Sequence, residues 1–181
     1  MMEGSACSYT YEHTGYFNAI VTDYVNAAPA LRPFYKHPVT PDGIKAAIHA
    51  REEFATDRKL LVTVLNDQYA QASLQGNALV DANINKLLQP TTFSICTAHQ
   101  PNIFTGYLYF IYKVLHVVKI AEQLKAAHPT FDFVPVYYMG SEDADLEELS
   151  KVFLHGEKLV WDTKQTGSVG RMKPKGVEVL I

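Results

Sequence analysis

The sequence has few features that would support disulfide bonds or a membrane span. Its two cysteines, Cys7 and Cys96, lie far apart in a polar and an apolar segment, so we expect reduced thiols in a cytoplasmic protein. The most apolar stretch, residues 107–120, is interrupted by lysines and is shorter than the roughly 20 residues that a spanning helix needs. The N-terminus has no basic region followed by an apolar one. We therefore predict neither a secretory signal nor a membrane partner.

An excess of one charge sign is also missing. The chain has 16 Lys and Arg residues against 19 Asp and Glu residues, for a formal net charge of -3. Such a chain lacks the positive field that binds a phosphate backbone, so we expect no nucleic-acid partner. The 7 histidines are scattered, and neither HExxH nor a paired CxxC occurs, so no metal site is predicted.

Apolar residues, in contrast, are plentiful, at 48% of 181 residues, which is enough for a real core. Capping residues such as Thr40, and apolar residues at helical spacing, predict three helices over residues 41–54, 58–76 and 78–88. The segment 16–25 fits no single pattern. We expect an N-terminal helical segment, residues 1–90, that packs on a core formed by residues 91–181.

The second half has the pattern of a βαβ unit. Residues 92–97 are predicted to form a buried strand, and residues 133–139 a second one, with a long apolar helix ending near Ala127 between them. A crossover helix implies that the two strands are parallel. Because this helix is apolar nearly all round, we expect the sheet to cover one side and the N-terminal helices the other. The predicted fold class is α/β, with a parallel sheet core preceded by N-terminal helices.

The last thirty residues predict smaller elements. Residues 151–154 and 158–161 have the pattern of a hairpin, and residues 167–174 that of a loop. An apolar element starts at Val177 and stops at Ile181 without a polar tail. Two or three parallel strands would leave an exposed apolar edge, so we expect the sequence to be one piece of a larger protein, with a core that is incomplete at the C-terminus.

The loop after the first predicted strand is the strongest candidate site. Ligands bind at the carboxyl ends of parallel strands, where the following helix offers free backbone N–H groups to an anion. The candidate binding residues here are Thr97, His99, Gln100, Asn102, Thr105 and Gly106. The alternative interpretation makes Thr105 a helix N-cap, Pro101 a turn former and His99 a surface residue.

The second candidate is the acidic loop after the second predicted strand, at the same rim. It contains Ser141 and three acidic residues, Glu142, Asp143 and Asp145. Their carboxylates can hold an amine or sugar hydroxyls, or one can act as a base. The alternative is that they complement a helix dipole, since Asp145 and Glu148 have capping-box spacing. The basic loop 164–175 can reach a phosphate or a carboxylate, although a solvated loop is the simpler account.

Two blocks of residues resemble the bacillithiol biosynthesis cysteine-adding enzyme family. They are TAHQPNIFTGYLY at 97–109 and PVYYMGSEDAD at 135–145, and residues 167–172 resemble a third, looser block. The family's proteins are much longer, so the resemblance assigns this chain to their N-terminal part. The chain departs from the usual blocks at Ala98, Asn102, Tyr107 and Ala144, where the family has glycine, glycine, proline and histidine.

The resemblance implies a Rossmann-like core and, in the full-length protein, a coiled coil that makes a homodimer. It implies a cytoplasmic ligase that joins cysteine to the glucosamine amine of glucosaminyl malate, with ATP or another nucleotide as cofactor. The implied catalytic residues are His99, Glu142, Asp143 and Asp145, and the implied substrate- or nucleotide-binding residues are Thr97, Gln100, Asn102, Thr105, Gly106 and Ser141. Two other functions stay open: a nucleotidyltransferase-like enzyme that adenylates another acid, and a non-catalytic module that binds a thiol sugar or a nucleotide.

Overall fold

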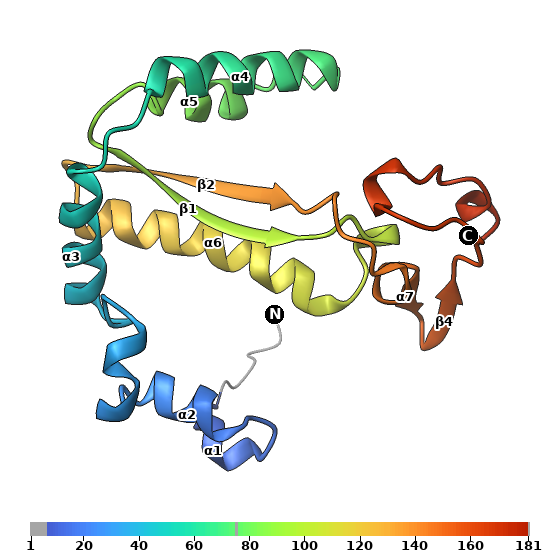
Figure 1. Cartoon of the computed structure of the whole chain (residues 1–181), viewed down its shortest axis with the longest axis horizontal. Coiled ribbons are helices and arrows are strands. Elements are labelled where there is room, and N and C mark those ends of the chain that lie inside the picture. The colour runs from blue at the N-terminus through green and yellow to red at the C-terminus, as the bar shows by residue number, and fades with distance from the viewer. Residues whose placement is uncertain (1–6, 75, 181) are drawn as a thin grey trace, which may run out of the picture. The chain divides into compact units, whose positions relative to one another are not determined.

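A computed structural model describes residues 7–74 and 76–180 of the chain, which form two compact units that divide between Thr56 and Asp57 (Figure 1). The division that the sequence predicts at residue 90 stays a prediction about the protein's domains. Gln75 and Ile181, at the predicted ends of two elements, lie outside the described residues.

The first unit is made of short helices. They are α1 (Tyr11–Thr14), α2 (Ala19–Val25), the 3-10 helix η1 (Pro29–Phe34) and α3 (Pro41–Glu52). The predicted start of α3 is confirmed, because the Thr40 side chain accepts a hydrogen bond from the Gly43 N–H at 3.1 Å. The segment that the sequence left unassigned forms α2, which Asn18 caps.

The second unit contains the two other predicted helices and the sheet. Helices α4 (Arg58–Gln71) and α5 (Ala78–Lys86) are confirmed, and Asp57 and Asn77 cap their N-termini. The Arg58 guanidinium ties both helices to the sheet, since it donates to the carbonyl oxygens of Leu87 at 2.9 Å and Thr92 at 3.1 Å. These bonds anchor the end of α5 beside the start of the first strand.

The predicted βαβ unit is confirmed. Strands β1 (Thr92–His99) and β2 (Asp132–Met139) pair in parallel, and helix α6 (Leu108–Ala127) connects them. The register runs from Thr92 opposite Asp132 to His99 opposite Met139, so both strands end at the same edge of the sheet. This edge positions the two candidate loops.

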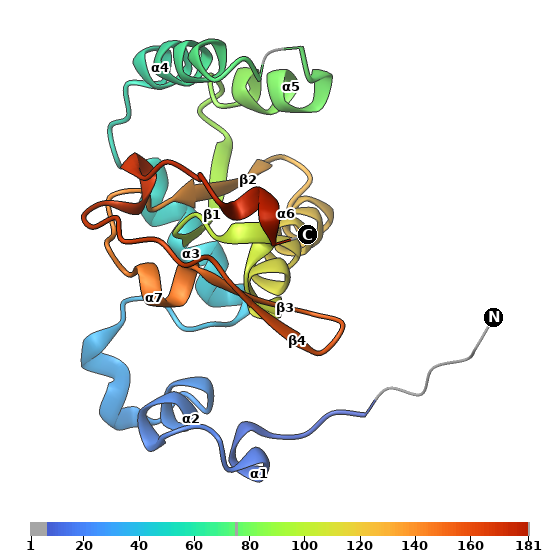
Figure 2. The ribbon, with the colours of Figure 1, turned by 90° about the vertical axis from the view of Figure 1, so that its right-hand side faces the viewer.

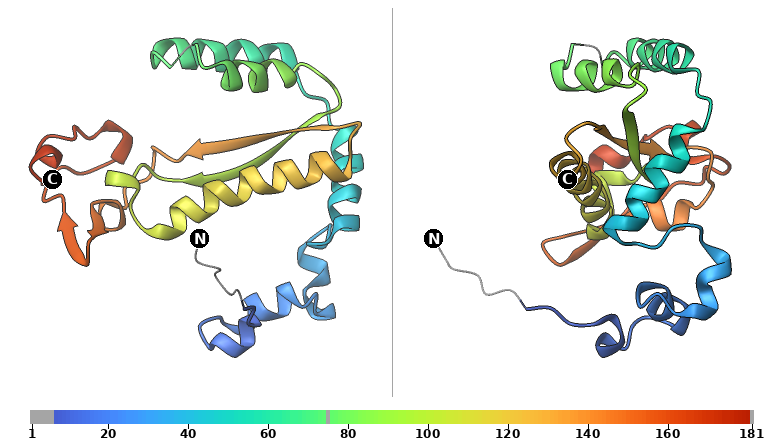
Figure 3. Two further views of the ribbon diagram at one scale, coloured as in Figure 1. Left: turned by 180° about the vertical axis from the view of Figure 1, so that it is seen from behind. Right: turned by 90° about the vertical axis from the view of Figure 1, so that its left-hand side faces the viewer.

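The two faces of the sheet have different covers (Figure 3). Val134 of β2 belongs to a buried cluster with Val62 of α4, Ile84 of α5 and Leu87, the residue after α5. Helix α6 packs on the other face, where Phe110 makes an edge-on contact with Tyr137 at 5.5 Å between ring centroids. The prediction that the N-terminal helices cover the second side of α6 is therefore wrong for α4 and α5, which lie on the opposite face of the sheet.

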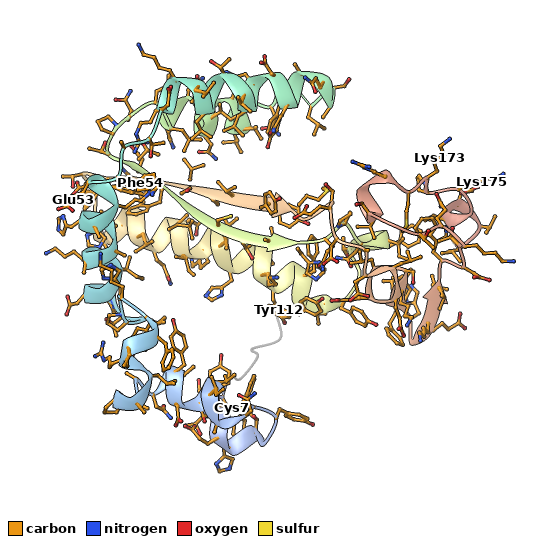
Figure 4. All side chains as sticks on the ribbon, in the orientation of Figure 1. Cys7, Glu53, Phe54, Tyr112, Lys173 and Lys175 are labelled. Atoms are coloured by element: carbon orange, nitrogen blue, oxygen red, sulfur yellow. The ribbon has the colours of Figure 1, made fainter. Side chains whose placement is uncertain are left out.

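Two consequences follow for exposure. The outward side of α6 is open, with Leu108, Tyr112 and Leu115 between 59% and 66% exposed, and Figure 4 shows Tyr112 on the side away from the sheet. Strand β1 is only partly buried, since Ser94 and Cys96 are exposed on the face that α4 and α5 cover incompletely. The prediction of a buried strand thus holds at Thr92 and Phe93 but is wrong for Ser94 and Cys96.

The C-terminal region follows β2. It contains α7 (Leu146–Leu149), the antiparallel hairpin of β3 (Lys151–Leu154) and β4 (Glu157–Val160), and the 3-10 turns η3 (Val169–Arg171) and η4 (Val177–Val179) (Figure 2). The predicted hairpin is confirmed. Trp161 anchors the following loop by donating its indole N–H to the Lys175 carbonyl oxygen at 3.0 Å. Among the described residues, no helix is both long and apolar enough to cross a membrane.

Candidate functional site

The edge at which β1 and β2 end brings the two predicted loops together. An open pocket of about 280 Å³ lies there. Its lining residues are Ala98, His99, Gln100, Tyr138, Gly140, Glu142 and Asp143. Four of the predicted site residues, His99 and Gln100 from the first loop and Glu142 and Asp143 from the second, therefore share one pocket.

Asp143 is held as a carboxylate. The Gln100 side-chain amide donates to its Oδ2, and the Ala144 backbone N–H donates to its Oδ1 at 2.7 Å. These hydrogen bonds, that of Gln100 first, hold the pKa of Asp143 below its usual value. Because an acid with a lowered pKa is a weaker base, Asp143 is better suited to bind a cation than to accept a proton.

Glu142 adds a second acidic group to the same pocket. The Tyr138 hydroxyl donates to Glu142 Oε1 at 3.3 Å, and the charge of Glu142 raises the pKa of Tyr138. With a carboxylate on each of two adjacent residues, the pocket can bind an ammonium group or sugar hydroxyls.

The same lining does not fit the phosphates of a nucleotide. No lysine or arginine stands among the residues that line the pocket, and its two charged side chains are acidic. Lys173 and Lys175, in the basic loop that the sequence singled out, extend outward from the C-terminal region (Figure 4). Within residues 7–74 and 76–180, no group of three or more His, Cys, Asp or Glu side chains could hold a metal ion.

His99 is buried at the end of β1, with 8% of its surface exposed. Its Nε2 lies 2.6 Å from the Tyr109 hydroxyl, and its Nδ1 lies 3.1 Å from the Gln100 carbonyl oxygen. Tyr109 also contacts the Glu148 carboxylate. The alternative of a surface histidine is therefore wrong, and both ring nitrogens already have polar neighbours within the protein.

Tyr109 remains protonated under ordinary conditions. Partial burial of the hydroxyl, and then the hydrogen bond to Glu148 with its negative charge, raises the pKa of Tyr109 to about 12, although 42% of the residue is exposed. The hydroxyl therefore has a single proton to donate, either to Glu148 or to His99.

The other predicted residues lie around this pocket. Asn102 and Ser141 line a neighbouring, mostly apolar pocket of about 420 Å³ against the C-terminal region. Asp145 caps α7, since its Oδ1 accepts from the Glu148 N–H at 3.3 Å, which confirms the capping interpretation. Thr97 pairs with Tyr137 in the sheet and lines neither pocket.

The turn between β1 and α6 explains Thr105 and Gly106. Thr105 ends the 3-10 turn η2 (Ile103–Thr105), and the N-cap position of α6 is Tyr107, so the N-cap alternative for Thr105 is wrong. Gly106 has a φ of 64°, and a Cβ there would lie 2.7 Å from Asn102 Cγ. Gly106 thus makes room for the Asn102 side chain, in a conformation that glycine adopts without strain.

Sequence reasoning missed three groups that shape the site. The C-terminal loop docks on the acidic loop, because the Val169 N–H donates to the Asp143 carbonyl oxygen at 2.8 Å and the Gly170 N–H to that of Ser141 at 2.9 Å. The Tyr137 hydroxyl donates to the His99 carbonyl oxygen at 2.8 Å. Tyr109 and Glu148 contact His99 from α6 and α7. The sequence signals were the capping-box position of Glu148 and the place of the other residues within the family-like blocks at 97–109, 135–145 and 167–172.

Comparison with known proteins identifies the family to which this chain is similar. Residues 2–181 match the family described as bacillithiol biosynthesis BshC, N-terminal Rossmann-like domain. This match confirms the predicted Rossmann-like fold class.

Individual relatives agree. A protein of Flavobacterium psychrophilum named "Putative cysteine ligase BshC" is 36% identical over 171 residues, which is 93% of this chain and 32% of the relative. The protein of the same name from Cytophaga hutchinsonii is 36% identical over 165 residues, which is 91% of this chain and 31% of the relative. That from Bacillus mycoides is 27% identical over 144 residues, which is 80% of this chain and 26% of the relative. The chain thus spans about a third of the length of these relatives.

Proposed function

Because this chain belongs to the BshC family of bacillithiol biosynthesis, we propose that it is the N-terminal part of a ligase that joins cysteine to the glucosamine amine of glucosaminyl malate. The observation that supports this reaction is the pair of carboxylates, Glu142 and Asp143, in one pocket at the end of the parallel strands. Amide formation needs a group that binds an amine and a group that accepts its proton.

The two carboxylates suit these two tasks. The acceptor amine arrives as an ammonium ion, which the ionised Asp143 binds. Glu142 accepts the proton that the nitrogen must lose before it attacks. The nitrogen then forms a C–N bond with the carboxyl carbon of cysteine and loses its second proton to the departing oxygen, whose bond to that carbon breaks. That oxygen would leave together with the group that activates the carboxylate. Gln100 keeps Asp143 in place throughout.

The remaining components are proposals for the full-length gene product. The implied nucleotide would activate the cysteine carboxylate, and its phosphates would bind outside the acidic pocket, whose lining does not fit them. We place the reaction in the cytoplasm and propose a homodimer for the full-length protein.

A binding measurement tests the assignment of the amine. Calorimetry on the full-length gene product should detect glucosaminyl malate, whereas its N-acetylated derivative, which has no positive charge, should bind at least tenfold more weakly. The Asp143→Asn variant should lose this discrimination. Equal binding of the two sugars to the unsubstituted protein would contradict the proposed role of the pocket.

A further inference from the structure

A chain of polar contacts leads from the pocket to residues that the proposed reaction does not use. Tyr109 Oη lies 2.6 Å from His99 Nε2 and hydrogen-bonds with Glu148 Oε1. Glu148 Oε1 lies 3.6 Å from the same His99 nitrogen. The three side chains come from the end of β1, the first turn of α6 and the short helix α7, so they join elements that are far apart in sequence.

The Glu148 carboxylate determines where the hydrogens on Tyr109 and His99 lie. An ionised carboxylate only accepts hydrogen bonds, so the Tyr109 hydroxyl donates its single proton to Glu148. The Tyr109 oxygen is then an acceptor for His99, and His99 Nε2 must carry a hydrogen. The charge on Glu148 therefore determines, through Tyr109, which atom of the buried ring is the donor.

The other side of the ring faces the pocket. With the hydrogen on Nε2, His99 Nδ1 is an acceptor, and the Asn102 side-chain amide lies 3.3 Å from it and donates to the Gln100 carbonyl oxygen at 3.3 Å. The Gln100 side chain in turn donates to Asp143. The ring is packed edge-on against Phe110, with 5.6 Å between ring centroids. A change in the orientation of His99 would thus move Gln100, and with it the carboxylate that binds the amine.

We propose that Tyr109 and Glu148 are positioning residues of this pocket: Glu148 acts through Tyr109 to hold His99 with a hydrogen on Nε2, and His99 holds the Asn102 amide, which keeps Gln100 against Asp143. The expected effect on turnover rests on the proposed function. The presence of a hydrogen on His99 Nε2 does not depend on the proposed function, and it is measured separately.

NMR tests the arrangement itself. Long-range ¹H–¹⁵N spectra of the full-length gene product labelled with ¹⁵N-histidine should show His99 Nε2 protonated. In Glu148→Gln the amide can donate to the Tyr109 oxygen, which frees the Tyr109 proton for His99, so Nε2 should lose its hydrogen. Tyr109→Phe leaves Glu148 Oε1, 3.6 Å from Nε2, as the acceptor, so Nε2 should keep its hydrogen there. An unprotonated Nε2 in the unsubstituted protein, or no change in folded Glu148→Gln, would overturn the proposal.

Steady-state kinetics test the consequence. Tyr109→Phe and Glu148→Gln should each raise KM for the amine acceptor about tenfold, with a smaller change in kcat, since a misplaced carboxylate weakens binding. Tyr112→Phe is the matched control on the exposed side of α6 and should behave like the unsubstituted protein. Unchanged KM in both variants would overturn the positioning role. If the unsubstituted protein forms no product, the proposed function fails, and the NMR result still decides on the arrangement.

Discussion

The sheet carries two hollows of opposite character. The larger, about 540 Å³, lies between its face and helices α4 and α5 and is lined mainly by apolar side chains such as Leu65, Val80 and Val136. The smaller, about 280 Å³, lies at the strand ends and contains Glu142 and Asp143. Size alone would favour the first as the active site. Chemistry favours the second, because only its lining has the paired carboxylates that can bind an amine and take its proton.

This contrast arises from one sheet. Side chains on the face of a strand alternate and meet the helices that cover it, so they are selected for packing. The loops at the strand ends have no helix packed over them and are available for polar side chains. The account therefore predicts that substitutions near the larger hollow change stability, whereas those at the strand ends change activity.

The largest expected effect is on stability. Leu87→Ala removes a buried side chain from the cluster with Val62, Ile84 and Val134 and should lower the free energy of unfolding by about 3 kcal/mol. Urea unfolding measures this loss. Leu88→Ala, at a neighbouring position that is 41% exposed, is the control and should cost far less. The turnover of the folded fraction should stay unchanged in Leu87→Ala, and a selective loss of turnover would assign the larger hollow to the active site.

The next effect is on substrate binding. Asp143→Asn keeps an oxygen that can accept from Gln100 but removes the charge, so KM for the amine acceptor should rise roughly 30-fold, equivalent to about 2 kcal/mol. Glu157→Gln on the exposed hairpin is the charge-matched control. A stability loss without a change in KM would make Asp143 a structural residue.

A smaller effect on stability separates the cost of a steric clash from the cost of backbone strain at two glycines. Gly106→Ala places a methyl group against Asn102 at a positive φ and should lower the unfolding free energy by about 2 kcal/mol. Gly156→Ala, at a φ of 86° with open space around it, has the backbone strain alone and should lose about half as much. Equal losses in thermal or urea unfolding would show that Asn102 moves freely aside.

The smallest effect concerns alkaline pH. The pKa of Tyr109 is raised from 10.0 to about 12 in the folded protein, so folding favours its protonated form. The resulting stability is fully present below pH 10 and is lost as the pH rises towards 12. Urea midpoints between pH 9 and 12, compared with those of Tyr109→Phe, should fall more steeply for the unsubstituted protein. Parallel curves would contradict the shift.

The sequence predicted the elements of the fold better than their packing. The cap at Thr40 and the β-prone runs around Ile95 and Val136 are local signals, and the structure confirms the elements they indicate. An apolar helix such as α6, however, does not specify which neighbour covers it. The assignment of α4 and α5 to α6, instead of to the opposite face of the sheet, failed for this reason.

The candidate site shows the same limit. His99, Gln100, Glu142 and Asp143 were predicted to share a rim because parallel strands end at one edge, and they do line one pocket. Tyr109 and Glu148 gave no comparable signal, since the contact of His99 with Tyr109 joins residues 10 positions apart and that of Tyr109 with Glu148 joins residues 39 positions apart. Such contacts depend on tertiary structure, which spacing along the chain does not reveal.

The most direct test of the central claim is detection of the product. The full-length gene product would be incubated with cysteine, glucosaminyl malate and ATP, with a control that lacks ATP, and the mixture analysed by mass spectrometry. The account predicts an amide between the cysteine carboxyl group and the glucosamine nitrogen, formed by the unsubstituted protein and reduced in Asp143→Asn at low acceptor concentration. A well-folded protein that forms no such amide would contradict it.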